Sequence, residues 1–289
     1  MLSVRSLNHQ PVVTGEIVNN EWRSKQFEPQ SASAIDLHLI LDRDGLRYLI
    51  IDTQNKKIHQ AGSFAVTHQD GDWLLKSLQH IKPAFELNAV FCSNASLPLA
   101  TVPERFFDPA AASAYLDLAF GSASDNVRIQ QLEPGKIVLV TEENNEWKRA
   151  VARVFPNVRF DNLMFHMNNF AQVMAKDSEP LMCLYTSDSF LEICLSNKDG
   201  LLFANCFETR SAEDLLYYVG LCAEEYHFDR NSNPVYLSGS QHLAFALLQK
   251  YFAKIQFPSI PTSIDNSEGI ENESISLFQP FFFKSLCEL

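Results

Sequence analysis

The chain has 289 residues, 46% of them hydrophobic and 20% charged, which is ordinary for a globular protein with a large core. Its net charge of -12 disfavours nucleic acid and anionic lipid surfaces as direct partners, because like charges repel. With no apolar run near the roughly 18 residues of a membrane span, no signal-peptide core and no Cys-x-x-Cys pair among its six cysteines, we expect a cytoplasmic protein without a membrane span whose cysteines are reduced.

The chain begins with a polar stretch, residues 1–33, which predicts an irregular and loosely held N-terminal arm. Alternating segments then predict a first lobe over residues 34–176. This lobe opens with a three-stranded meander, in which the Asp-Gly pair at residues 44–45 marks the first hairpin. The strands expected here are 35–41, 46–52, 57–66, 87–92, 126–132 and 136–141. The helices are one that ends at His80 with Asp70 or Asp72 as its cap, then 108–120, 145–154 and 162–175.

A polar stretch over residues 176–180 predicts a boundary, with a second lobe and a C-terminal tail over residues 177–289. The order of elements then repeats the opening of the first lobe. The strands expected here are 181–186, 190–195, 201–207 and 235–237, and the helices are 211–225 and 241–251. A three-stranded meander followed by a helix and a strand therefore occurs twice. This duplication predicts a two-lobed α/β protein with mixed sheets flanked by helices.

The C-terminal tail is rich in phenylalanine, with Phe281, Phe282 and Phe283 in a row. Adjacent residues of a strand point to opposite faces, so both faces of this segment need a cover. One interpretation is a tail strand packed between the lobes. The other is a surface that binds another protein.

The duplicated pattern resembles the ribonuclease-H-like lobes of actins, hexokinases and chaperone ATPases. A closer resemblance is carried by the order and spacing of residues 37–52, 102–108, 202–207, 213–218, 236–239 and 282–288. These stretches are similar to a family of uncharacterised Bacteroidota proteins with an actin-like ATPase fold, which is distantly similar to pilus-assembly and secretion proteins. The resemblance implies a fold and no established activity.

ATPases of this superfamily bind nucleotide through three turns, and the resemblance implies where these turns lie. The first phosphate turn corresponds to the hairpin at residues 42–47. Asp42 and Asp44 are its candidate Mg²⁺ ligands, since magnesium prefers carboxylate oxygens. However, Arg43 and Leu46 replace the small residues that let a backbone approach phosphate.

The other two turns lie in the second lobe. The second phosphate turn corresponds to residues 185–190, which contain Asp188 and no glycine. The third turn, Ser238-Gly239-Ser240, joins a predicted strand to a predicted helix. Turns of this form carry adenosine in the superfamily, because small residues let the backbone approach a ligand.

Each candidate residue also has a structural interpretation. Asp42, Asp44 and Asp188 can stabilise hairpin turns, as aspartate commonly does. Gly239 can serve a strand-to-helix corner that has no room for a Cβ atom.

With both phosphate turns altered, the sequence favours a binding or scaffold protein that has lost catalysis. This hypothesis predicts a protein partner, no catalytic residue, no metal site and no cofactor, with the three turns left as a vestigial nucleotide cleft. The alternative is an ATP-dependent phosphotransferase or ATPase in which the aspartates of the turns hold Mg²⁺ beside ATP. The sequence leaves the partner and the oligomeric state open.

Overall fold

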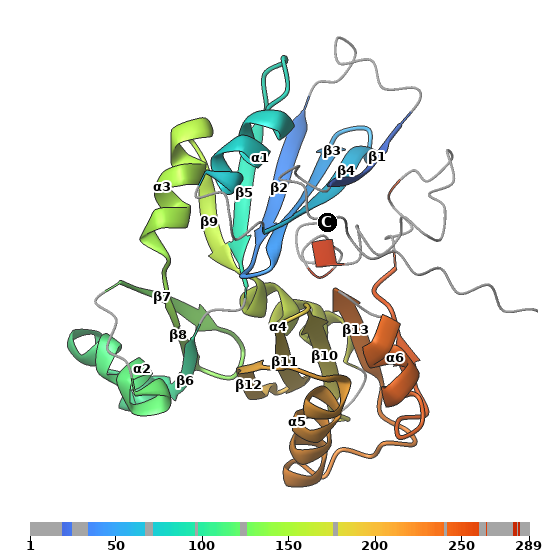
Figure 1. Cartoon of the computed structure of the whole chain (residues 1–289). Helices are drawn as coiled ribbons and strands as arrows, with labels where there is room; N and C mark the ends of the chain where they lie inside the picture. The colour runs from blue at the N-terminus through green and yellow to red at the C-terminus, as the bar shows by residue number, and fades with distance from the viewer. Residues whose placement is uncertain are drawn as a thin grey trace, which may run out of the picture.

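The computed structural model describes residues 19–24, 34–66, 72–95, 98–121, 126–175, 179–239, 242–259, 264, 280, 281 and 283. The described chain forms two large mixed sheets and one small antiparallel sheet. Figure 1 shows the first large sheet in the upper half of the molecule and the second in the lower half. No described helix is both long and apolar enough to cross a membrane.

The first sheet has six strands in the order β1-β4-β3-β2-β5-β9. They are β1 (Asn19–Arg23), β2 (Ile35–Leu41), β3 (Gly45–Asp52), β4 (Lys57–Ala65), β5 (Ala89–Asn94) and β9 (Arg159–Asn162). The first four pair antiparallel, and β5 and β9 extend the sheet parallel to β2. Helices α1 (Trp73–Ile81) and α3 (Asn145–Val154) share an apolar core with one face of this sheet.

The second sheet has five strands in the order β12-β11-β10-β13-β14. They are β10 (Leu181–Thr186), β11 (Phe190–Asn197), β12 (Gly200–Glu208), β13 (Val235–Gly239) and β14 (Ile255–Gln256). Helices α5 (Ala212–Glu225) and α6 (His242–Leu248) lie on one side, and α4 (Leu163–Met174) packs against β10, β11 and β12. In Figure 1, α4 accordingly lies between the two large sheets.

The small sheet, in the order β6-β8-β7, projects to the left of the second sheet in Figure 1. Its strands are β6 (Leu99–Pro103), β7 (Val127–Leu132) and β8 (Ile137–Glu142). The segment between β6 and β7 forms two short 3-10 turns, η2 (Glu104–Phe106) and η3 (Pro109–Ala111), and helix α2 (Ala112–Phe120). Leu116 of α2 is buried against this sheet, whereas Leu139 of β8 joins the central core.

The repeated element order predicted from the sequence is present in the structure. In the first sheet, β2, β3 and β4 form an antiparallel meander and β5 pairs parallel with β2. In the second, β10, β11 and β12 form the same meander and β13 pairs parallel with β10. The first strand of each meander is central and buried on both faces. Strand β10 is accordingly almost continuously apolar, whereas β2 also buries Asp36 and His38.

Helix starts also follow the sequence closely. Asn144 accepts backbone N–H groups at the start of α3, and Asn162 does so at the start of α4. Ser211 and Asp214 lie at the start of α5, where each side chain accepts a backbone N–H group. The Ser211 side chain accepts the N–H of Asp214, but the Asp214 carboxylate accepts from Arg210 rather than from Ser211.

Three expectations need correction. Residues 19–23 are not irregular, because they form β1 and pair with β4. Strands β6, β9 and β14 were not predicted; β9 and β14 are short. In the Phe-rich tail, the described residues Phe281 and Phe283 are helical rather than extended, while Phe282 and residues 284–289 lie outside the described residues.

The described part of the tail is core. Phe281 and Phe283 are 3% and 0% exposed and belong to one apolar cluster with Ile40 of β2 and Cys183 of β10. The ring of Phe283 meets Phe170 of α4 edge to face, with centroids 5.0 Å apart. This cluster takes residues from both large sheets, so the tail helps to join the two halves of the molecule. The division of the chain near residue 176 stays a prediction.

Candidate functional site

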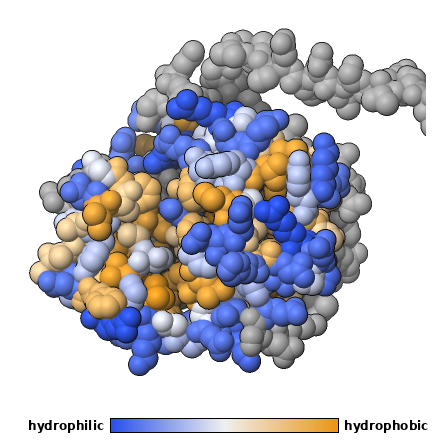
Figure 2. All heavy atoms as spheres, turned by 90° about the horizontal axis from the view of Figure 1, so that it is seen from below, coloured by the Kyte–Doolittle hydropathy of each residue, from blue (hydrophilic) through white to orange (hydrophobic). Residues whose placement is uncertain are grey.

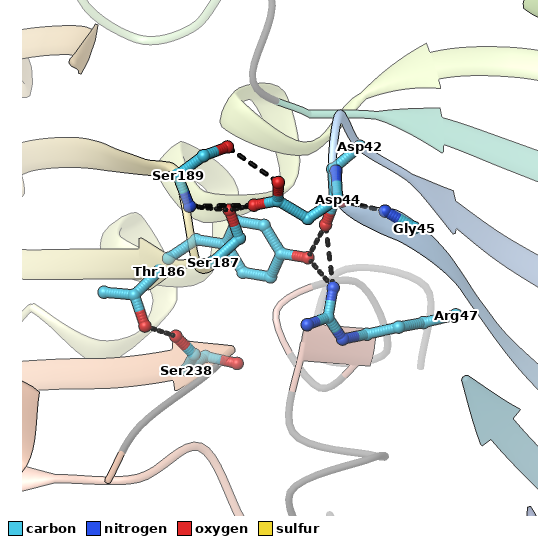
Figure 3. Close-up of polar contacts among 9 residues, drawn as sticks. Asp42, Asp44, Gly45, Arg47, Thr186, Ser187, Ser189 and Ser238 are labelled. Carbon is cyan, nitrogen blue, oxygen red and sulfur yellow. Dashed lines mark hydrogen bonds and ion pairs between the residues drawn. The ribbon is translucent and has the colours of Figure 1, made fainter. Parts of the chain in front are cut away.

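Two hairpins of the duplicated fold face each other between the large sheets (Figure 3). The β2–β3 loop comes from the first half, and the β10–β11 loop comes from the second half. Each loop is closed by a backbone hydrogen bond that spans two residues. The N–H of Asp42 donates to the carbonyl of Gly45, and the N–H of Ser187 donates to the carbonyl of Phe190. These are the positions that correspond to the two predicted phosphate turns.

Asp42 organises the first hairpin and is fully buried. One carboxylate oxygen, Oδ1, accepts the backbone N–H groups of Asp44 and Gly45, both at 2.8 Å. This is the turn-stabilising role that aspartate commonly takes. Residue 45 is glycine because β4 lies close to this position. A Cβ atom there would lie 2.2 Å from the carbonyl oxygen of Phe64.

The second oxygen of Asp42 reaches across to the other half. Its Oδ2 accepts hydrogen bonds from Arg47 Nη1 and from the Tyr185 hydroxyl, both at 2.7 Å. Burial raises the pKa of the Tyr185 phenol well above its ordinary value, so this hydroxyl stays protonated and donates. Burial lowers the pKa of the Arg47 guanidinium, but the net shift is upward, with the Asp42 carboxylate among the neighbours that raise it, so Arg47 stays charged.

Asp44 makes the second bridge between the halves. Its Oδ1 accepts the Ser189 hydroxyl at 2.7 Å, and its Oδ2 accepts the backbone N–H of Ser189 at 2.9 Å. The hydroxyl of Ser187 also donates to Oδ2 of Asp44. Both carboxylate oxygens therefore hold the loop of the opposite hairpin.

We call these six residues the hairpin latch: Asp42, Asp44, Arg47, Tyr185, Ser187 and Ser189. The latch consists of charge-assisted hydrogen bonds in a largely buried setting, where such bonds are strong. A further ion pair, Arg43 to Glu208 at 2.9 Å, also joins the halves. Both of its side chains are exposed, so solvent screening leaves it a small contribution.

Two of the predicted site residues lie in the hairpin latch, and the others lie outside it. Asp42 and Asp44 come together in the hairpin latch, as their spacing in one turn predicts. Asp188 sits in the opposite loop and is exposed, and its charge contributes to the raised pKa of Arg47. Ser238 and Gly239 end β13, and Ser240 lies outside the described residues.

The corner at Gly239 is packed against the neighbouring strand. Gly239 has a φ of +92°, and a Cβ atom there would lie 1.9 Å from the carbonyl oxygen of Thr186. The Thr186 hydroxyl donates to the carbonyl of Ser238 at 3.2 Å. Glycine is therefore required at this corner by backbone conformation and by the close approach of β10.

Sequence reasoning missed the donor side of the latch. Arg47, Tyr185, Ser187 and Ser189 were not singled out, although Arg47 lies in one predicted turn and the other three in its counterpart. The available signal was the duplication, since equivalent hairpins of two facing halves approach each other. Among the described residues, no group of three or more His, Cys, Asp or Glu side chains is arranged to hold a metal ion.

Comparison with solved structures defines the class of protein. A protein from Bacteroides thetaiotaomicron VPI-5482 with an actin-like ATPase fold and unknown function has 16% identity and a TM-score of 0.68, and the match covers 91% of this chain and 99% of that one. A chain of the PilM-PilN type IV pilus biogenesis complex has 12% identity and a TM-score of 0.61, with 87% and 96% covered. The fold is the actin-like ATPase fold, as the sequence predicted.

The family follows from a sequence match. The family described as "Protein of unknown function (DUF3822)" matches residues 24–255, and the chain belongs to this family. The family resemblance inferred from the sequence is thereby confirmed. No curated protein matches the chain.

Proposed function

We propose that this protein is a non-catalytic binding protein on an actin-like fold, in which the two phosphate-turn hairpins bind each other instead of a nucleotide. The observation that carries the proposal is the bonding of Asp44. Both of its carboxylate oxygens accept hydrogen bonds from the opposite hairpin, at Ser187 and Ser189. An aspartate held in this way is not free to bind the water shell of Mg²⁺.

The energy of the latch supports the same conclusion. A hydrogen bond to a charged group contributes about 1.5–3 kcal/mol, and nucleotide binding would have to break several of them. Each 1.4 kcal/mol of such a cost weakens affinity about tenfold. Asp42 adds to the cost, because it has four donors and no exposed surface.

A protein partner and a cytoplasmic location belong to this proposal. The second structural neighbour is a chain of a pilus biogenesis complex, so the fold occurs there in a protein that assembles with another. The described cysteines, Cys92, Cys183, Cys194, Cys206 and Cys222, are all free thiols, which suits a reducing compartment.

The test is calorimetric titration of the purified chain with Mg²⁺-ATP, together with an assay for phosphate release. We expect no saturable heat at millimolar nucleotide and no turnover. A second titration uses the Ser187→Ala and Ser189→Ala double variant, which removes two hydroxyl donors of the latch. Nucleotide binding gained only by the double variant would support a site closed by the latch.

The alternative function, an ATP-binding phosphotransferase or ATPase with unusual phosphate turns, makes the opposite prediction. It requires the wild-type chain to bind Mg²⁺-ATP and Asp44→Asn to weaken that binding. Micromolar binding with phosphate release by the wild-type chain would overturn the proposal of a non-catalytic protein.

A further inference from the structure

A strip of five aromatic rings runs along the boundary between β12 and α5. Neighbouring rings are in contact, with centroids 5.4, 4.3, 6.3 and 5.5 Å apart in the order Tyr217, Tyr218, Phe207, Phe203 and Tyr226. We call these residues the aromatic strip. None of them takes part in the hairpin latch, although β12 pairs with β11, the strand that follows Ser189 of the latch.

The aromatic strip is only partly covered by the rest of the fold. Tyr217 is 63% exposed, and Leu221, one helical turn further along α5, is 51% exposed. The other four rings of the strip are half-buried. Figure 2 views the molecule from below, the side on which α5 lies in Figure 1, and shows apolar areas interrupted by hydrophilic ones on this face. Apolar surface of this kind on a globular protein commonly marks an interaction site.

The charges around the aromatic strip have one predominant sign. Between Phe203 and Tyr226 the chain has five acidic residues and a single basic one, Arg210. The acids include Glu213 and Asp214 at one end of α5 and Glu224 and Glu225 at the other. Two arginines from outside this stretch also lie here, since Arg43 pairs with Glu208 and Arg230 donates to the Gly220 carbonyl of α5. Helix α5 itself contains four acids and no Lys or Arg. The strip is therefore an apolar surface between two acidic ends.

The aromatic rings and the carboxylates beside them together indicate which kind of partner can bind here. Aromatic faces attract guanidinium and ammonium groups, and carboxylates at the rim strengthen the attraction. A second copy of this chain is disfavoured on the same face, because two copies would bring like charges together. Nucleic acid and anionic lipid are disfavoured for the same electrostatic reason.

We infer that the aromatic strip binds a basic segment of a protein partner, in which Arg or Lys alternates with aliphatic residues. The aliphatic side chains pack along the exposed edge of the strip, and the cations lie over the exposed ring of Tyr217 or beside Glu213 and Glu224. Tyrosine and arginine are the residues that contribute most at protein interfaces. The inference rests on the proposed binding function and specifies its partner.

The experiment is a binding titration measured by fluorescence anisotropy. The probe is a labelled short peptide in which Arg alternates with Leu, and a second peptide has Glu in place of each Arg. The titrations use the full chain and four variants. Tyr217→Ala and Glu213→Lys alter the strip, while Tyr251→Ala and Glu86→Lys make the same changes at exposed positions outside it.

We expect the wild-type chain to bind the Arg peptide and not the Glu peptide. Tyr217→Ala should weaken binding about tenfold, as expected for a contributing interface tyrosine. Glu213→Lys should weaken it about threefold and make it less sensitive to salt, because one rim charge is reversed. The two control variants should bind like the wild type, and unchanged melting curves will show that the variants are folded.

Three results would overturn the inference: no binding of the Arg peptide, equal binding of the Glu peptide, or equal weakening by Tyr217→Ala and Tyr251→Ala. These outcomes do not bear on the Mg²⁺-ATP titration. If the chain binds neither the peptide nor Mg²⁺-ATP, the inference about the aromatic strip is wrong. The proposal of a non-catalytic protein is then still supported.

Discussion

At the scale of single residues, the buried carboxylate of Asp42 depends on donors from both halves. The Tyr185 hydroxyl is one of its four donors. Tyr185→Phe keeps the ring and removes the hydroxyl, which donates to Asp42 and accepts from Arg47. We therefore expect the free energy of unfolding to fall by about 1–3 kcal/mol. Urea unfolding measures the change. Tyr236→Phe is the matched control on β13, and an equal loss there would contradict the role given to the Tyr185 hydroxyl.

Gly239 provides a second test at this scale. Its Cβ would clash with the Thr186 carbonyl at 1.9 Å, in addition to the strain of a φ of +92°. Gly121 also has a positive φ, +69°, but a Cβ there would meet nothing within 4 Å. Gly121→Ala should therefore cost about 1 kcal/mol, and Gly239→Ala clearly more. Urea unfolding of the two variants measures the difference, and similar losses would show that close packing is not what requires glycine at 239.

The acceptor residues of the latch could be found from the sequence, but its donor residues could not. Asp42 and Asp44 stand beside a glycine in a hairpin, which is a recognisable turn pattern. Tyr185 and Ser189 look like ordinary residues of a strand and a loop. Their role arises only when the two halves pack together, and that arrangement is not encoded in local spacing.

At the scale of elements, Glu143 ties the small sheet to α3. Its carboxylate accepts from Arg128 of β7 at 2.7 Å and from Lys148 of α3 at 2.8 Å. Burial raises its pKa, but the two cations lower it by more, so the pKa lies below the ordinary value of 4.5. A lowered pKa in the folded state means that the carboxylate stabilises the fold above its unfolded pKa. That contribution is lost as the pH falls through the folded value.

Glu143→Gln should accordingly unfold at lower urea concentration than the wild type near neutral pH. The difference between the two proteins should shrink in acid, below pH 4.5. Urea midpoints measured across this range test the sign. The exposed Glu86→Gln is the control and should show little difference from the wild type at any pH. If the difference in urea midpoint between Glu143→Gln and the wild type stays constant in acid, Glu143 contributes to stability by packing rather than by charge.

Elements of six or more residues with a regular apolar pattern were predicted well, and short ones were not. Strands β2 and β10 and helix α3 have the bounds expected from their sequences. Strand β9 has four residues and β14 has two, too few to show an alternating pattern. Strand β1 is polar and exists because the edge of β4 pairs with it, which local sequence does not reveal.

At the scale of the whole molecule, one apolar cluster and one polar latch join the two halves. The cluster includes Leu49 of β3 and Cys183 of β10, with Phe281 and Phe283 of the tail among them. The sequence left the tail as either core or binding surface. Because the described tail residues are buried, shortening the chain at this end should weaken the contact between the halves rather than remove a docking site.

Phe283→Ala tests this directly. Phe283 is fully buried against Phe170, so its loss leaves a cavity between the halves and should cost about 3–5 kcal/mol. Hydrogen exchange should rise in β3 and in β10 together, because the cavity is shared by both sheets. Phe106→Ala is the matched control, since Phe106 is 62% exposed and its removal should change stability little. If the two variants lose equal stability, the tail is not core. If exchange rises in β10 alone, the tail belongs to one half and does not join the two sheets.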